Sequence, residues 1–307
     1  MKEIKVIGHK VPDTDCTLSA IIMADFLEKK WYKSEYFIQW KLNKETEFVL
    51  DYFWIEVPKI KTSFEAGTRV CLVDHNEKTQ SLDNLEELEV EWIVDHHKFD
   101  FKSKSPLYIK AEPLCSTGSI LYKLYKENNF EISTKIANLI LTCILSDSLL
   151  FRSATTTKED TLIAEELKQI SDIKNIDEFA MKMFDAKSDL WDISVLDLIK
   201  YDYKEFNFNW KKAWIGTLET TNPNYALWRK KEILEWLKTI KENDKLDFIM
   251  LSIVDILNEK NTTIILDEDA KIISEVFNTE VNDNLADLKN RLSRKKQIVP
   301  ELSKYFV

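Results

Sequence analysis

The chain has 307 residues and a formal net charge of −10, with 43 lysine and arginine residues against 53 aspartate and glutamate residues. This acidic balance argues against broad binding to nucleic acid or to an anionic membrane, although a local basic patch could still hold an anionic substrate. The length favours two domains of ~100–200 residues each. No apolar segment fits a signal peptide or a membrane span, and the four cysteines form no CxxC pair, so we expect a soluble cytoplasmic protein with buried free thiols.

Short apolar runs alternate with stretches of helical periodicity along the first half of the chain. Strands are predicted at residues 3–8, 36–40, 70–73 and 91–94, and helices at 18–31, 45–53, 119–128, 133–146 and 158–171. This alternation predicts an α/β domain built on a parallel sheet.

The pattern becomes less regular between residues 186 and 208, and a second block then begins. It has predicted strands at 213–218, 247–256 and 262–266, and predicted helices at 224–243 and 269–277. We therefore expect one domain of residues 1–188 and a second, smaller α/β domain of residues 189–307.

Glycine is scarce, with only four in the whole chain. A GxGxxG dinucleotide loop and a Walker A loop both need several glycines, so neither is present. If the protein binds phosphate, side chains or metal ions must hold it.

The four histidines are concentrated in three short motifs that also carry aspartate: GHKVPDTD, VDHNE and VDHHK. Each motif directly follows a predicted strand. The carboxyl ends of parallel strands meet at one edge of a sheet, where ligand crevices form. We therefore expect these side chains to converge there: His9, Asp13, Asp15, Asp74, His75, Asp95, His96 and His97.

So many carboxylates cannot stay ionised together without a compensating cation. Imidazole and carboxylate ligands without thiolate suit Mn²⁺, Co²⁺, Fe²⁺ or Zn²⁺, and their number favours two ions that share one carboxylate. Asp147 interrupts the apolar run of residues 139–151, which makes it a further candidate ligand. Taken alone, each motif has an ordinary structural explanation; Asp15, for example, could cap the helix predicted at 18–31.

A basic run near the C-terminus contains Arg291, Arg294, Lys295 and Lys296. Such a run is usually a solvated surface, but arginine and lysine together also form phosphate sites. Lys204 is another candidate, with no sequence signal of its own.

These motifs together resemble the family II, manganese-dependent inorganic pyrophosphatases of the DHH phosphoesterase superfamily. The segments that carry the resemblance are GHKVPDTD, VDHNE, VDHHK, SDSLLFRSATTT and SRKKQIVP, and they span almost the whole chain. The resemblance implies one metal site at His9, Asp13 and Asp74, and a second at Asp15, Asp74, His96 and Asp147. It also implies that His97, Lys204, Arg294 and Lys295 contact the substrate, and that these four and the bridging Asp74 take part in catalysis. By the same resemblance, residues 1–188 form the metal-binding catalytic domain, residues 189–307 form the substrate-binding domain, and the active site lies between them.

The implied activity is hydrolysis of pyrophosphate to two phosphates by a homodimer that holds two Mn²⁺ (or Co²⁺) ions per site, with additional Mg²⁺ on the substrate. Three departures from the family pattern, at Val11, at Cys115 and in the segment before Ser293, fall outside the implied ligands.

Two alternatives remain open at this stage. Another DHH phosphoesterase would keep the metals but cleave short polyphosphate or a nucleotide phosphate. A protein that only binds metal or phosphate would have no activity.

Overall fold

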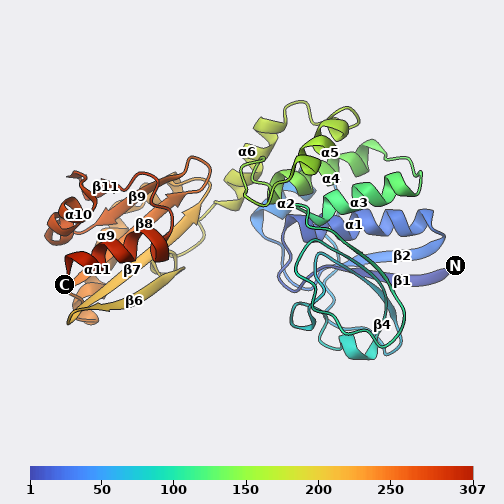
Figure 1. Cartoon of the computed structure of the whole chain (residues 1–307), viewed down its shortest axis with the longest axis horizontal. Helices are drawn as coiled ribbons and strands as arrows, with labels where there is room; N and C mark the ends of the chain where they lie inside the picture. The colour runs from blue at the N-terminus through green and yellow to red at the C-terminus, as the bar shows by residue number, and fades with distance from the viewer. Residues whose placement is uncertain (307) are drawn as a thin grey trace. The chain divides into compact units, whose positions relative to one another are not determined.

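The computed structural model describes residues 1–306 and divides the chain into two compact units, Met1–Lys187 and Ser188–Val307 (Figure 1). Each unit has its own sheet and its own buried apolar residues. Within the described residues, no helix is both long enough and apolar enough to cross a membrane.

The first unit is built on a five-stranded sheet of order β2-β1-β3-β4-β5. All neighbouring strands in it are parallel, which confirms the predicted parallel sheet. The strands are β1 (Lys2–Ile7), β2 (Tyr32–Phe37), β3 (Arg69–Val73), β4 (Glu89–Asp95) and β5 (Tyr108–Ala111). Because the order reverses beside β1, the carboxyl ends of β1 and β3 flank the position where ligands bind in open sheets of this kind.

Six helices belong to this unit: α1 (Thr14–Lys29), α2 (Lys44–Tyr52), α3 (Thr117–Glu127), α4 (Thr134–Asp147), α5 (Lys158–Lys168) and α6 (Ile176–Lys187). Helices α1, α3 and α4 pack against one another beside the sheet (Figure 1). A separate apolar cluster of the same sheet includes Ile7, Leu72 and Ile93, and loop residues such as Phe64 and Phe101 pack against it.

Helix α1 begins at Thr14, four residues before the predicted start. Asp13 is its N-cap and accepts a hydrogen bond from the backbone of Cys16, so the alternative explanation of Asp15 as the cap of this helix does not hold. Strand β2 lies earlier than predicted, and β5 and α6 were not predicted. Strand β5 is short and largely exposed, so its sequence lacks the apolar run of a buried strand.

The second unit has a mixed six-stranded sheet of order β10-β11-β9-β8-β7-β6, in which only β7 and β8 are parallel. Its strands are β6 (Tyr203–Phe208), β7 (Lys211–Thr220), β8 (Phe248–Asp255), β9 (Lys260–Ile265), β10 (Val281–Asn282) and β11 (Leu285–Asp287). This agrees with the predicted second α/β domain, although β6 was not predicted. Strand β6 lies at the edge of the sheet and is mostly exposed.

Helices α7 (Val195–Ile199), α8 (Asn224–Leu227), α9 (Lys230–Asn243), α10 (Ala270–Phe277) and α11 (Val299–Tyr305) complete this unit. The single helix predicted at 224–243 is two helices, α8 and α9. The basic run forms a short helical turn, η4 (Arg294–Ile298), that leads directly into α11. Ile298 and Leu302 are buried in the core of the unit, so the basic run is anchored.

Candidate metal centre and anion cleft

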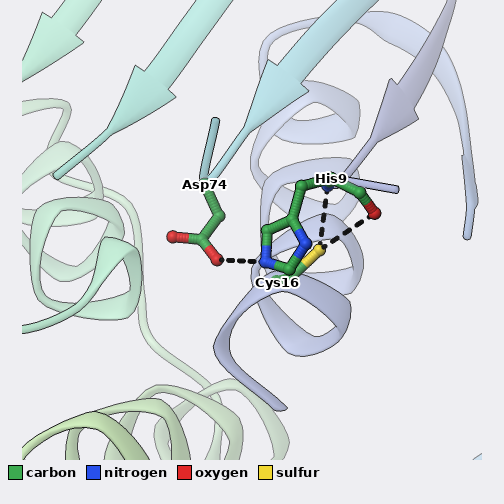
Figure 2. Close-up of side chains that lie close together, drawn as sticks. All are labelled: His9, Cys16 and Asp74. Atoms are coloured by element: carbon green, nitrogen blue, oxygen red, sulfur yellow. Dashed lines mark hydrogen bonds and ion pairs between the residues drawn. The ribbon is translucent and has the colours of Figure 1, made fainter. Parts of the chain in front are cut away.

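The carboxylate of Asp74 lies between two imidazoles. Its Oδ2 is 3.3 Å from His9 Nε2, and its Oδ1 is 3.3 Å from His96 Nε2. Figure 2 shows the His9 side of this arrangement, with the imidazole directed at the carboxylate from the end of β1. The backbone of Asp74 has φ of 61°, a left-handed conformation that non-glycine residues rarely adopt. The fold therefore holds this carboxylate in place at a conformational cost.

Two more carboxylates come from the start of α1. Asp13 Oδ2 is 3.6 Å from His9 Nε2, while the Oδ1 of the same residue caps the helix. Asp15 is fully buried and accepts hydrogen bonds from the backbone N–H groups of Thr117 and Gly118, at 2.7 and 3.1 Å. These N–H groups belong to the first turn of α3, where a helix favours a negative charge.

His96, directly after β4, and Asp147, the last residue of α4, complete the cluster. His96 Nδ1 is 3.0 Å from the carbonyl oxygen of Leu114, which can only accept, so Nδ1 carries the proton. The other nitrogen, Nε2, faces Asp74 and lies 3.9 Å from Asp147 Oδ2. Ligand atoms of Asp15, His96 and Asp147 all lie within 4.8 Å of one another. A backbone carbonyl on the far nitrogen is the usual way to orient a metal-binding imidazole.

His97 lies beside the cluster and is about half exposed. Its Nδ1 is 3.0 Å from Asp95 Oδ1 and 3.7 Å from Asp74 Oδ1. Asp95 is buried and accepts a further hydrogen bond from Asn76 at 2.6 Å, so it orients the His97 ring. The hydrogen bond to Asp95 raises the pKa of His97.

The prediction that all four histidines converge is wrong for His75. Its Nδ1 lies 2.9 Å from the carbonyl oxygen of Val73, and its Nε2 lies 3.1 Å from the hydroxyl of Ser81. Both ring nitrogens are thus engaged outside the cluster. Burial lowers the pKa of His75 to about 4, so this ring stays neutral and has a structural role.

The cluster strongly perturbs its own ionisation. Burial and the charge of Asp74 raise the pKa of Asp15 to about 7, and burial and Asp15 raise the pKa of Asp147 well above its usual value. Burial alone would also raise the pKa of Asp74, but hydrogen bonds to His9 and His96 outweigh it and hold that pKa far below its usual value. For His96, burial is outweighed by the hydrogen bond to Asp74 and by nearby carboxylates, which raise its pKa to about 9.

Residues that the sequence did not single out support this cluster. The hydroxyl of Thr117 donates a hydrogen bond to Asp74 Oδ1 at 2.9 Å. Cys16 Sγ accepts the backbone N–H of His9 at 3.0 Å and lies beside the His9 ring on the side away from Asp74 (Figure 2). A threonine at a helix start is typically read as a capping residue, and a buried cysteine as core, so neither carries a distinctive sequence signal.

The donor set fits divalent transition-metal ions. Imidazole nitrogen and carboxylate oxygen atoms converge from both sides of Asp74, and mutual repulsion among the carboxylates would be relieved by cations. Ligands of these types suit Mn²⁺ among the first-row metals.

In the second unit, Lys204, Arg294 and Lys295 line one cleft of about 540 Å³. The Arg294 guanidinium is already engaged, because it donates to Asp202 Oδ1 at 2.7 Å and to the carbonyl oxygens of Asp202 and Ile215. Within residues 1–306, the side-chain ammonium groups of Lys204 and Lys295 have no hydrogen bond or ion pair. Arg291 instead pairs with Glu301 at 3.2 Å.

Comparison with known proteins gives consistent results for both units. Residues 3–144 match the DHH family, N-terminal domain, and residues 181–305 match the DHHA2 domain. The chain is 38% identical to the manganese-dependent inorganic pyrophosphatase of Bacillus subtilis, with 99% of this chain and 98% of the relative covered. It is 42% identical to a Deinococcus radiodurans protein assigned the same activity, with 99% and 98% covered.

A solved structure from Methanococcus jannaschii, assigned to the family II inorganic pyrophosphatases, matches with a TM-score of 0.64 and 35% identity. The match covers 99% of both chains. Together with the two domain matches and the curated relatives, it places the chain among the manganese-dependent, family II inorganic pyrophosphatases, to which this protein belongs.

Proposed function

We propose that this protein hydrolyses inorganic pyrophosphate to two orthophosphates, with Mn²⁺ as its resident metal and two cations per active site. The observation that carries this proposal is the position of Asp74, which presents one carboxylate oxygen to His9 and the other to His96. A carboxylate with one imidazole on each side is suited to bridging two cations. The curated relatives named for this activity support the choice of substrate and metal.

In this proposal His9, Asp13 and Asp74 hold one cation, and Asp15, Asp74, His96 and Asp147 hold the other. Bound cations supply Lewis-acid activation of water and neutralise charge on the transferring phosphoryl group. The residues of the chain hold them in place: Thr117 fixes Asp74, and the first turn of α3 fixes Asp15.

His97 is proposed to donate a hydrogen bond to the leaving phosphate. Its ring is half exposed and is oriented by Asp95 through Nδ1, which leaves Nε2 as the outer nitrogen. Lys204, Arg294 and Lys295 are proposed to bind phosphate oxygens, and Mg²⁺ to accompany the substrate. Cationic side chains stabilise the charge that a phosphoryl transfer spreads over its oxygens.

The test is phosphate release from pyrophosphate by protein that has been stripped of metal and refilled with Mn²⁺, Co²⁺ or Mg²⁺. We expect high activity with Mn²⁺ or Co²⁺, and much lower rates on tripolyphosphate and on a dinucleotide. No release from pyrophosphate with either transition metal would overturn the proposal, and faster cleavage of tripolyphosphate would favour another DHH phosphoesterase.

Asp74→Asn removes the bridging charge with little change in shape. We expect it to lower activity by roughly a thousandfold or more, because both cations lose a ligand charge at the reacting centre. Asp51→Asn, at an exposed site on α2, is the matched control and should leave the rate unchanged. An Asp74→Asn variant with normal turnover would contradict the bridging role.

The homodimer and the cytoplasmic location are also part of the proposal. All four cysteines are buried and free, which supports a reducing compartment. The edge strand β5 exposes Tyr108 and Ile109, which gives a sheet edge that a second chain could pair with. Light scattering should give about twice the chain mass; the mass of one chain would contradict the dimer.

A further inference from the structure

The cleft of the second unit contains a buried side chain that the sequence motifs do not include. Thr217 lies on β7, lines this cleft together with Lys204 and Lys295, and is 5% exposed. Its backbone N–H donates to the carbonyl oxygen of Asp202 at 2.8 Å. Its hydroxyl oxygen, however, is buried and has no hydrogen-bond partner among the residues that the structure describes.

The polar residues beside Thr217 do not supply that partner. Ser252, opposite Thr217 in the parallel pairing of β7 and β8, begins a chain of hydrogen bonds across the sheet. Its hydroxyl is 3.1 Å from that of Thr263, the Thr263 hydroxyl donates to Asn261 Oδ1 at 3.0 Å, and the Asn261 amide donates to the carbonyl oxygen of Arg291 at 2.7 Å.

The direction of this chain is determined by its last acceptor. Because the Arg291 carbonyl can only accept, Asn261 presents its NH₂ group there and its oxygen to Thr263. The single hydroxyl proton of Thr263 is then used, so Ser252 must donate toward Thr263. These hydrogen bonds run away from Thr217, and no hydrogen bond joins its hydroxyl to that of Ser252, so the Thr217 hydroxyl has no partner among the described residues.

An unsatisfied buried hydroxyl destabilises a folded protein, so its presence in a cleft calls for a ligand that satisfies it. The cleft carries three cationic side chains against the two carboxylates of Asp202 and Glu219, and Asp202 is already paired with Arg294. The ammonium groups of Lys204 and Lys295 have no hydrogen bond or ion pair within residues 1–306. Ammonium groups and a hydroxyl donor together match a tetrahedral oxyanion with several acceptor oxygens.

We propose that the Thr217 hydroxyl donates a hydrogen bond to a phosphate oxygen held between Lys204 and Lys295, and is thus a further substrate-binding residue. This inference rests on the proposed pyrophosphatase function for the identity of the anion. It assigns to β7 a contact that a sequence motif of basic residues would not reveal.

The experiment uses the full Mn²⁺-loaded chain and measures the dissociation constants of inorganic phosphate and imidodiphosphate by calorimetry. Thr217→Val keeps the shape of the side chain and removes the hydroxyl. We expect it to raise both constants roughly tenfold or more, as for loss of a hydrogen bond to a charged group. Thr217→Ser restores the hydroxyl donor, so its dissociation constants for the two anions should lie within about threefold of those of the unmodified protein. A difference of about threefold is well below the effect expected for loss of the hydrogen bond.

The unliganded melting temperature separates binding from structure. Because Thr217→Val removes an unsatisfied hydroxyl, we expect the variant to melt at the same temperature or higher while it binds phosphate less tightly. Ser252→Ala is the matched control. It removes the neighbouring hydroxyl, which is hydrogen-bonded to Thr263 and not to Thr217, so the phosphate affinity of this variant should be unchanged.

Unchanged phosphate affinity in Thr217→Val would overturn the inference, as would a loss of affinity that also lowers the melting temperature and is not rescued by Thr217→Ser. Different results would contradict the proposed pyrophosphatase function and the proposed role of Thr217. If the unmodified protein releases no phosphate from pyrophosphate while binding of the two anions still depends on Thr217, only the reaction is wrong. If it turns over pyrophosphate normally and Thr217→Val has the same affinity and the same KM, only the inference is wrong.

Discussion

Gly8 and Cys16 together set the position of His9. A Cβ atom on Gly8 would lie 2.2 Å from Cys16 Sγ, and the same sulfur accepts the His9 N–H. We therefore predict that Gly8→Ala displaces His9 and weakens Mn²⁺ binding by about tenfold or more, because small misplacements of a ligand strongly reduce affinity. Equilibrium dialysis measures the effect. Adding Cys16→Ala removes the clashing sulfur and should restore part of the affinity; no recovery would show that the sulfur is not the obstacle.

Protons compete with metal at the same residues. In the absence of metal the pKa of His96 is raised to about 9 and that of Asp15 to about 7, and hydrogen bonds to Asp13 and Asp74 outweigh burial and hold the pKa of His9 far above its usual value. At neutral pH both imidazoles therefore carry a proton that a metal ion must displace. Metal affinity falls as pH falls and rises across pH 6 to 9, by about tenfold per pH unit for each proton displaced.

The logarithm of the Mn²⁺ affinity should rise more steeply with pH below pH 7, where Asp15 must also lose a proton, than between pH 7.5 and 8.5. Free Mn²⁺ measured by electron paramagnetic resonance across this range tests the prediction. His75 serves as an internal contrast, since its pKa is lowered to about 4 and it adds no proton above pH 6. A Mn²⁺ affinity that does not change from pH 6 to 8.5 would contradict the predicted competition between protons and metal.

At the scale of elements, the start of α1 combines two roles in Asp13. One carboxylate oxygen caps the helix through the Cys16 N–H, and the other faces His9. Asp13→Asn keeps a good capping residue but removes the charge, so it should weaken Mn²⁺ binding while the metal-free protein unfolds at the same denaturant concentration. Asp13→Ala should lose both the metal-binding carboxylate and the helix cap, and loss of the cap should lower the free energy of unfolding by about 1 kcal/mol.

Denaturant unfolding of the two metal-free variants, followed by circular dichroism, separates the roles. Equal stability of Asp13→Ala and the unmodified protein would show that the cap contributes nothing. Equal Mn²⁺ affinity of Asp13→Asn and the unmodified protein would remove Asp13 from the metal site.

The sequence predicted most of the elements whose apolar runs are buried, and missed the edge strands β5 and β6 and the helix α6. Strands β1, β3 and β4 were predicted close to their observed bounds, and with them the positions of His9, Asp74 and His96. Strands β5 and β6 expose most of their residues, so no apolar period marks them. His75 could not be separated from the other histidines by sequence, because its orientation depends on the Val73 carbonyl and on Ser81.

The unpredicted parts of the site depend on contacts between distant segments. Thr117 reaches Asp74 across 43 positions of sequence, and Asp15 is held by residues more than 100 positions away. Thr217 is singled out because its buried hydroxyl has no hydrogen-bond partner among the described residues, which only the folded structure reveals. Ligand types and strand ends can be inferred from motifs, whereas the groups that orient them follow from the folded structure.

At the scale of the whole molecule, the proposed metal ligands and the proposed phosphate-binding residues Lys204, Arg294 and Lys295 belong to different folding units. All proposed metal ligands fall between residues 9 and 147, within Met1–Lys187, while the cleft residues fall within Ser188–Val307. Each unit has its own core, so calorimetry should resolve two unfolding transitions. A ligand that binds only the folded form of one unit stabilises that unit, by about 2.7 kcal/mol at a free concentration about a hundredfold above Kd.

We therefore predict that Mn²⁺ raises one transition by several degrees and leaves the other in place. Asp74→Asn should abolish that shift, which assigns the responsive transition to the first unit. Inorganic phosphate added without metal should raise the other transition, and Thr217→Val should reduce that second shift but not the first. A single transition that moves as one with either ligand would show that the two units unfold cooperatively, and Mn²⁺ that raises both transitions equally would place metal ligands outside residues 9 to 147.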